Sequence, residues 1–330
     1  MKLGCSYFGN RILKHVAEDM KYLAGNHFTY VVHTFSENDF RFYAGTMKEI
    51  IRISKDCGLE TLIDPWGVGR VFGGEAFSEF VAFHPEECQM LNDGKPSANA
   101  CPNNPKFRAF MKNWIETAVG TGADYVFWDE PHFYLSSWMG GRPNTWGCRC
   151  KYCAKKFEEE YNMPMPLEET PTVNEFKHYS IRAFLQEMLN HAHQYGAKNS
   201  LCILPHSAAN DVAMRDFAEM NNLEDFGTDP YWYGINKNAQ QYVGETSRKV
   251  FEVCREVGRN GHIWIQGFKI PAGREKEIEI AVKAAVDAGI RNLAVWGFDA
   301  CGNMSSIAPD DPKKAWQIIL ESFKSVKDLK

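Results

Sequence analysis

The chain has 330 residues, a formal net charge of −5 and 24% charged residues, with both signs interspersed. No basic segment marks a nucleic-acid surface, and no apolar run approaches the roughly 20 residues that span a bilayer. The first residues lack the apolar core of a signal peptide, and the cysteines show no regular disulfide framework. We therefore expect a cytoplasmic protein without nucleic-acid or membrane partners.

Short apolar runs alternate with amphipathic helical patterns along the chain. The predicted strands are Leu3–Phe8, Thr29–Phe35, Thr61–Trp66, Tyr125–Trp128, Leu201–Pro205, Phe226–Tyr231, His262–Phe268 and Asn292–Phe298. Helical patterns between and after them cover Arg11–Ala24, Ala44–Cys57, Lys106–Gly120, Val173–Tyr195, Ala239–Gly258, Glu275–Ala288 and Asp311–Val326. Eight apolar strands alternating with helices predict a (β/α)8 TIM barrel. An open doubly wound sheet is disfavoured because no GxGxxG turn follows the first strand.

Two connections are long, namely Gly67–Pro105 after strand three and Pro131–Val173 after strand four. Long connections in compact domains are usually functional loops. The chain shows no repeat, low-complexity segment or linker, so we expect residues 1–330 to form a single catalytic barrel domain.

The predicted strand ends are rich in acidic residues. Strand three ends at Asp64, strand four at Asp129 and Glu130, strand six at Asp229 and strand eight at Asp299. A barrel brings such ends to one rim, where one carboxyl group could protonate a glycosidic oxygen while a second acts as nucleophile or base. Aspartate at a strand end is also common turn chemistry.

The adjacent pair after the apolar strand Tyr125–Trp128 carries the strongest signal. Two neighbouring acids there are costly unless they are hydrogen-bonded or used. We predict Asp129, Glu130 and Asp229 as catalytic residues, and leave open which of the first two reacts. Strand seven ends at Gln266, where many retaining β-glycosidases carry a glutamate nucleophile. Because an amide cannot form a glycosyl ester, the second carboxylate must come from elsewhere.

Aromatic and polar residues at the same strand ends are predicted to bind substrate. The aromatic faces suit the C–H face of a sugar, although packing and nucleobase stacking would explain them as well. The predicted substrate-binding residues are Asp64, Trp66, His132, His206, Tyr231, Trp232, Gln266, Trp296 and Asp299.

Three histidines, His33, His132 and His206, end strands two, four and five. With Glu130 and Asp229 they could bind a catalytic metal, or they could hydrogen-bond sugar hydroxyls. We favour the second interpretation because no HExxH or HxH spacing is present.

A CxCxxC cluster, Cys148, Cys150 and Cys153, follows strand four. Such a cluster is a moderately specific zinc signal that needs a fourth ligand, for which Cys101 is the candidate. The alternative, four free thiols in a loop, would be prone to oxidation. We predict a structural zinc site.

The segments CPNNPKFRAFMKNWI and CRCKYCAKKFEEEY, on either side of the acidic strand four, resemble glycoside hydrolase family 42, the zinc-containing β-galactosidases. The resemblance covers Cys101–Tyr161. It implies a barrel, the four cysteines as structural zinc ligands and Glu130 as the acid/base. Two positions depart from the family, since Asp129 replaces its asparagine and Gln266 its glutamate.

The segment GADYVFWDEP is also similar to strand four of the clan D α-glycosidases. That resemblance implies Asp129 as the nucleophile and Asp229, on strand six, as the acid/base. Both resemblances lead to a glycoside hydrolase that acts on a carbohydrate.

Two other hypotheses are kept. One is a metal-dependent barrel enzyme, a sugar isomerase or hydrolase, built on the rim histidines. The other is a catalytically inactive carbohydrate-binding barrel, which Gln266 favours. Sugar identity, anomeric preference and association into a homo-oligomer stay open.

Overall fold

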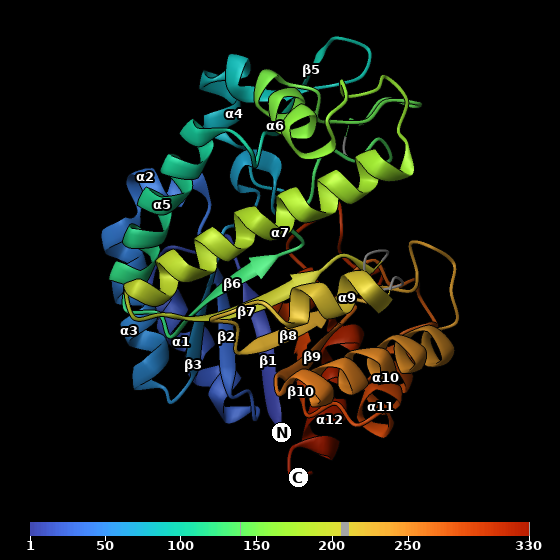
Figure 1. The fold of residues 1–330 in the computed structure, drawn as a ribbon. Helices are drawn as coiled ribbons and strands as arrows, with labels where there is room; N and C mark the ends of the chain where they lie inside the picture. The colour runs from blue at the N-terminus through green and yellow to red at the C-terminus, as the bar shows by residue number, and fades with distance from the viewer. Residues whose placement is uncertain (139, 206–210, 330) are drawn as a thin grey trace.

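The computed structural model describes residues 1–138, 140–205 and 211–329. Eight parallel strands close into a barrel in the order β1-β10-β9-β8-β7-β6-β3-β2 (Figure 1). They are β1 (Lys2–Tyr7), β2 (Tyr30–Thr34), β3 (Glu60–Asp64), β6 (Tyr125–Asp129), β7 (Lys198–Ile203), β8 (Asp225–Thr228), β9 (Asn260–Ile265) and β10 (Asn292–Val295). The predicted (β/α)8 barrel is confirmed, and each predicted strand overlaps an observed one.

Helices pack around the outside of this barrel. They are α1 (Leu13–Gly25), α2 (Glu37–Phe42), α3 (Ala44–Asp56), α4 (Glu79–Phe83), α5 (Pro105–Gly120), α6 (Lys151–Tyr161), α7 (Pro171–Gln194), α9 (Asp211–Ala218), α10 (Ala239–Val257), α11 (Lys276–Asp287) and α12 (Pro312–Val326). None of the described helices is long and apolar enough to cross a membrane.

Local sequence fixes where several of these helices begin. Asn104, Thr170 and Asp311 each accept a backbone N–H bond in the first turn of α5, α7 and α12, and each is followed by proline. A polar N-cap followed by proline satisfies the unpaired N–H groups and presets the backbone for a helix. The predicted starts of these helices are therefore close to the observed ones.

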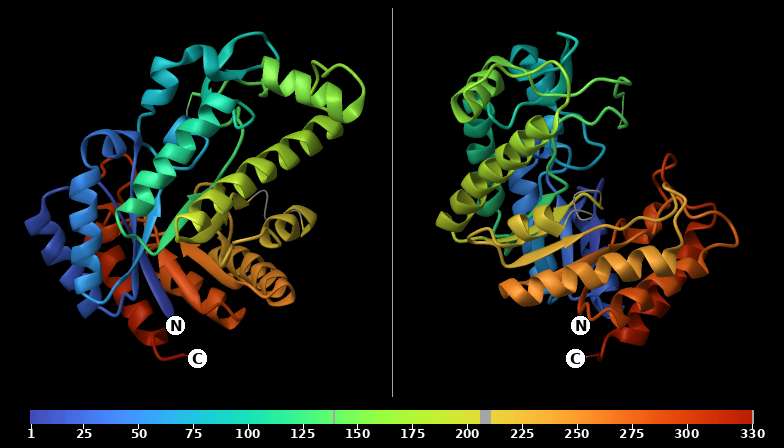
Figure 2. Two further views of the ribbon diagram at one scale, coloured as in Figure 1. Left: turned by 60° about the vertical axis from the view of Figure 1, so that its left-hand side comes forward. Right: turned by 45° about the vertical axis from the view of Figure 1, so that its right-hand side comes forward.

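The two long connections, after β3 and after β6, lie side by side at one end of the molecule (Figures 1 and 2). The first contains η1 (Val68–Arg70), α4, η2 (Pro85–Glu87) and an antiparallel hairpin of β4 (Cys88–Met90) and β5 (Pro96–Ala100); the second contains α6. Helix α7 extends beyond the strands to reach this region (Figure 2). These short elements had no periodicity that the sequence analysis could detect.

Inside the barrel, small residues make room for large rings. A Cβ at Gly4 would lie 2.1 Å from the ring of Tyr30, and one at Gly227 would lie 2.5 Å from the ring of His262. Alternate residues of each strand point inward, so Leu62 and Phe127 lie in the interior cluster while Ile63 and Trp128 pack against the helices. Asp64 and Asp129 follow by two residues and therefore share the inward face at the C-terminal rim.

Candidate active site

Four predicted acids come together at the C-terminal rim of the barrel. Asp64 ends β3, Asp129 ends β6, Glu130 follows it, and Asp229 follows β8. Asp64 and Asp229 are 0% and 3% exposed, whereas Asp129 and Glu130 are only partly buried. Two carboxyl groups are therefore reachable from solvent and two lie beneath them.

The loop after β3 packs against the exposed pair at Gly73. A Cβ at Gly73 would lie 2.5 Å from Oδ2 of Asp129 and 3.0 Å from Oε2 of Glu130, so these two oxygens are no more than 5.5 Å apart. The N–H of Gly73 donates to the carbonyl of Asp129 at 2.9 Å, and the N–H of Glu130 donates to the carbonyl of Cys202 at 2.9 Å. Glu130 has a φ of +41°, which ends the strand and turns its side chain away from the regular alternation.

The four carboxyl groups raise one another's affinity for protons. Burial, followed by the charges of Asp129, Glu75 and Glu130, raises the pKa of Asp64 well above its ordinary value. Burial and the charges of Glu130 and Glu75 raise the pKa of Asp129 in the same direction. Among the described residues, no cation is a cause of either shift, so the site favours protonated carboxyl groups at neutral pH.

A hydrogen bond joins the side chains of Glu130 and Asp229. Burial is the largest cause of the raised pKa of Glu130, and the charge of Asp229 and this bond add to it. Burial raises the pKa of Asp229 to about 8, although accepting the bond from Glu130 opposes the shift. The proton of the pair therefore resides on Glu130, and Asp229 is the acceptor.

Aromatic rings adjoin the acids. Phe8 stacks between Trp66 and Trp296, with centroids 5.5 and 5.6 Å away, and Trp66 follows Asp64 by two residues. Tyr231 meets the ring of Phe268 edge to face at 4.9 Å. The predicted residues Trp66, Tyr231 and Trp296 thus belong to one interior cluster at this rim. Phe8, which the sequence analysis did not assign to the site, is its central ring.

Several predicted site residues lie elsewhere. Trp232 is fully buried in the outer core and its indole N–H donates to Glu277 of α11, so it does not join the rim cluster. Gln266 is 1% exposed; its Oε1 accepts from the N–H of Tyr233 and its Nε2 donates to the carbonyl of Phe268. Its amide thereby holds the loops after β8 and β9 together.

The remaining polar residues do not converge. Burial and then Asp19 raise the pKa of Asp299, whose charged neighbours are Asp19 and Lys313 and not the rim acids. His132 stacks on Trp138, and its Nδ1 lies 2.5 Å from the carbonyl of Glu130. His206 lies outside the described residues.

His33 faces the helices and not the barrel interior. Its Nε2 lies 2.8 Å from Oγ of Ser54 on α3, and burial lowers its pKa to about 3. It cannot join His132 and Asp229 around one ion. Among the described residues, no three carboxylate or histidine groups are close enough together to hold a metal. The structure therefore does not assemble the histidine metal site considered from the sequence.

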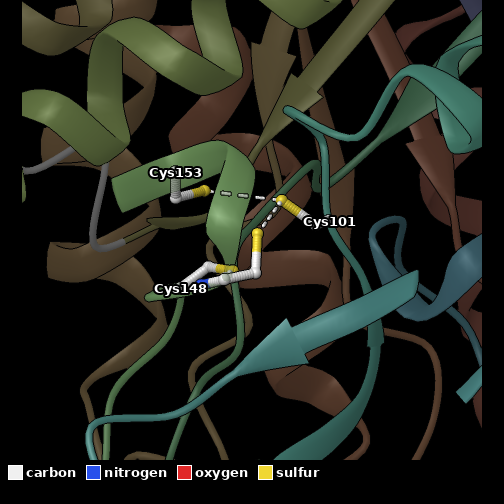
Figure 3. A group of neighbouring side chains, drawn as sticks. Cys101, Cys148 and Cys153 are labelled. Atoms are coloured by element: carbon white, nitrogen blue, oxygen red, sulfur yellow. Dashed lines mark hydrogen bonds between the residues drawn. The ribbon is translucent and has the colours of Figure 1, made fainter. Parts of the chain in front are cut away.

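The four cysteines do converge (Figure 3). The sulfur of Cys101 lies 3.4 Å from that of Cys153 and 3.6 Å from that of Cys150, and all four sulfurs, including that of Cys148, are within 4.8 Å of one another. Cys101, Cys148 and Cys153 are fully buried. This cluster could hold a metal ion, and it joins the segment before α5 to the start of α6.

Two residues of the site were missed from the sequence. Glu75, in the loop before α4, is exposed and contributes charge to three of the four acids. Gly73 lies in contact with Asp129 and Glu130. The paired glycines at 73 and 74 were the signal available, because a close approach of backbone to a functional group needs a residue without a side chain.

No family model matches the chain, and no curated protein matches it. Solved structures with the same fold do. A β-galactosidase from Bacillus circulans sp. alkalophilus superposes with a TM-score of 0.72 at 12% identity, over 100% of this chain and 56% of that one. The catalytic domain of a β-amylase from Paenibacillus polymyxa superposes with a TM-score of 0.66 at 10% identity, over 98% and 97%. A D-psicose 3-epimerase gives 0.52 at 11% identity, over 99% and 98%. At these identities the likeness establishes the barrel fold.

Proposed function

We propose that residues 1–330 form one catalytic domain, a glycoside hydrolase in which Glu130 is the general acid and Asp129 the second carboxylate. The observation that carries the proposal is the hydrogen bond that keeps a proton on Glu130 beside a second, solvent-reachable carboxyl group. Cleavage of a glycosidic bond needs those two groups. The β-galactosidase and β-amylase neighbours, with carbohydrate substrates in their names, agree with this assignment.

The structure-based assignment of Asp229 differs from the sequence-based one. Asp229 is in hydrogen-bond contact with Glu130, so no sugar ring fits between the two groups. We assign Asp229 the role of positioning residue, which orients the carboxyl group of Glu130 and raises its pKa. Glu130 then gives its proton to the glycosidic oxygen as the bond breaks.

Asp129 is left to act at the anomeric carbon. Its Oδ2 is no more than 5.5 Å from Oε2 of Glu130. Carboxyl groups about 5–5.5 Å apart are typical of retaining enzymes, whereas inverting enzymes need about 6.5–9.5 Å to accommodate a water molecule. The separation therefore favours Asp129 as a nucleophile and retention of configuration.

We also propose that the four cysteines bind a structural Zn²⁺. Tetrahedral Zn²⁺ with Zn–S bonds of about 2.3 Å places its sulfurs ~3.8 Å apart. The observed separations of 3.4 and 3.6 Å, between Cys101 and its neighbours Cys153 and Cys150, are close to that spacing. The ion would fix the loop after β6 and the segment before α5, which frame the rim.

The deciding experiment measures hydrolysis of α- and β-linked aryl glycosides by the wild type, Asp129→Asn and Glu130→Gln. We expect Glu130→Gln to lower kcat/KM by about 10²–10⁴-fold on 4-nitrophenyl glycosides, and by much less on 2,4-dinitrophenyl glycosides, whose leaving group needs no acid. Asp129→Asn should fail on both, and NMR of the first product should show retention. Activity that survives both substitutions together would remove the proposal. Turnover of no glycoside would favour a carbohydrate-binding barrel.

A further inference from the structure

A cavity of about 340 Å³ opens at the same rim, between the β1–α1 loop and the 3₁₀ helix η3 (Phe298–Cys301). Its lining includes Phe8 and Asn10 from the first loop, Asp19 from α1, and Phe298, Asn303 and Met304 from the segment after β10. Pockets of about 300–1,000 Å³ accommodate small organic ligands. None of the acids assigned to catalysis lines this cavity.

The polar groups of the cavity are held in place. The hydroxyl of Tyr7 donates to Oδ2 of Asp19 at 2.5 Å, and Nδ2 of Asn10 donates to the hydroxyl of Tyr7 at 3.0 Å. The side chain of Asn303 has no hydrogen-bond partner among the described residues. An oriented carboxylate and a free amide supply acceptors and donors for hydroxyl groups.

The apolar part of the lining completes a surface with two characters. Phe298 meets Tyr7 edge to face at 5.5 Å, which fixes its ring at the cavity wall, and Met304 lies beside it in the lining. Ligand sites typically combine such an apolar surface with a few fixed polar groups. A pyranose ring, with hydroxyls at its edge and C–H groups on its face, matches this combination.

The cavity adjoins the acids through one aromatic stack. Phe8 lines the cavity and stacks on Trp66, which follows the rim acid Asp64 by two residues. Both faces of Phe8 are covered by the rings of Trp66 and Trp296, so Phe8 forms a rigid partition between the cavity and the acid cluster. A ligand in the cavity would lie beside the reacting bond and not in its place.

We propose that this cavity is a second sugar-binding subsite, so that the substrate is an oligosaccharide and not a simple monoglycoside. The inference rests on the proposed glycoside hydrolase function. Asp19 and Asn303 bind hydroxyls of the second sugar unit, and Phe298 and Met304 contact its C–H face.

The test compares the 4-nitrophenyl monoglycoside that the wild type cleaves best with the trisaccharide of the same sugar and anomeric linkage. Asn303→Trp fills the cavity from an exposed position, and Asn303→Ala removes only the amide. The matched control is Asn113→Trp, at an exposed position on α5. We expect Asn303→Trp to lower kcat/KM for the trisaccharide, relative to that for the monoglycoside, by about tenfold or more. Asn303→Ala should lower it by less, and the control should keep the wild-type ratio.

An unchanged ratio in Asn303→Trp would overturn the subsite while the hydrolase function stands. If no glycoside is cleaved, calorimetric binding of cellotriose, maltotriose and mannotriose decides separately. Binding that is about tenfold weaker in Asn303→Trp than in Asn113→Trp supports the subsite although the hydrolase proposal has failed. Equal binding by the two variants, or binding of none of the three sugars by the wild type, overturns it.

Discussion

Asp129 and Glu130 are neighbours in the chain but have different surroundings. Asp129 lies on the inward face of β6 above the buried Asp64, whereas the positive φ of Glu130 turns that residue toward Asp229. Carboxyl groups in unlike environments separate into acid and base roles. The hydrogen bond to Asp229 makes Glu130 the proton carrier of the pair.

Substituting Asp229 should therefore move the pH dependence of activity. The negative charge of Asp229 raises the pKa of Glu130. In Asp229→Asn that charge is absent, so Glu130 loses its proton at lower pH and the alkaline limb of kcat/KM moves to lower pH. The pH profile of aryl glycoside hydrolysis measures the shift. An alkaline limb that stays at the wild-type pH would contradict the positioning role.

Gly73 provides a steric test of the same centre. A Cβ there would lie 2.5 Å from Oδ2 of Asp129, and Gly73 does not have the positive φ that strains other residues. Gly73→Ala should displace the carboxyl groups and lower kcat by about tenfold or more, because small misplacements cost large factors in rate. Gly45→Ala, on α3 with open space around it, is the matched control. Equal activity of the two variants would show that Asp129 and Glu130 adapt freely.

Among the elements, the loops after β3 and β6 depend on contacts between each other and with the barrel. Buried Glu37 on α2 accepts from the N–H groups of Gly69 and Phe80 and from the hydroxyl of Ser78, which fixes the first loop. Gln89 of β4 accepts from the N–H of Tyr134 in the second loop. The cysteine cluster adds the third connection, between the segment before α5 and α6.

Metal removal should therefore loosen this region. We expect about one zinc per chain by elemental analysis. Chelation, or Cys153→Ser, should lower the melting temperature and increase proteolysis between residues 88 and 165, because the sulfurs otherwise remain a buried, uncompensated cluster. Cys57→Ser, at a cysteine outside the cluster, is the control. A protein without metal that melts at the same temperature after chelation would refute the zinc site.

The whole barrel encloses acids that favour protonation, which links its stability to pH. The pKa of Asp64 is raised in the folded state, mainly by burial, above the value near 3.9 expected in the unfolded chain. The folded state then binds the proton more tightly, so the stabilisation is present below about pH 4 and is lost as the pH rises toward the folded pKa. For Asp229 the same loss extends to about pH 8.

Asp64→Asn should weaken this dependence. The amide cannot ionise, so the free energy of unfolding should fall less between pH 5 and pH 8 than in the wild type, by about 1.4 kcal/mol or more, the equivalent of one pKa unit. Urea unfolding at the two pH values measures the difference. Asp287→Asn, at an exposed position on α11, should follow the wild type. Parallel curves for Asp64→Asn and the wild type would contradict the link.

The barrel was predictable because burial of a parallel strand on both faces requires a continuous apolar run, which is visible in the chain itself. Strand ends were legible for the same reason: Asp64, Asp129 and Asp229 interrupt such runs and must share one rim. The cysteine spacing in residues 148–153 likewise predicted a cluster, since three closely spaced thiols need little tertiary information to meet.

Side-chain partners depended on contacts between distant segments. Local pattern gives Trp232 and Tyr231 the same appearance, yet one packs outward on Glu277 and the other faces Phe268. Gln266 resembles a site residue until the loops it joins are in place. The approach of Gly73 to Asp129, the bond between Glu130 and Asp229, and the cavity beside Phe8 all arise from loops that periodicity does not describe. Apolar burial is encoded residue by residue along the chain, whereas the pairing of polar groups at the rim is decided only when the barrel closes.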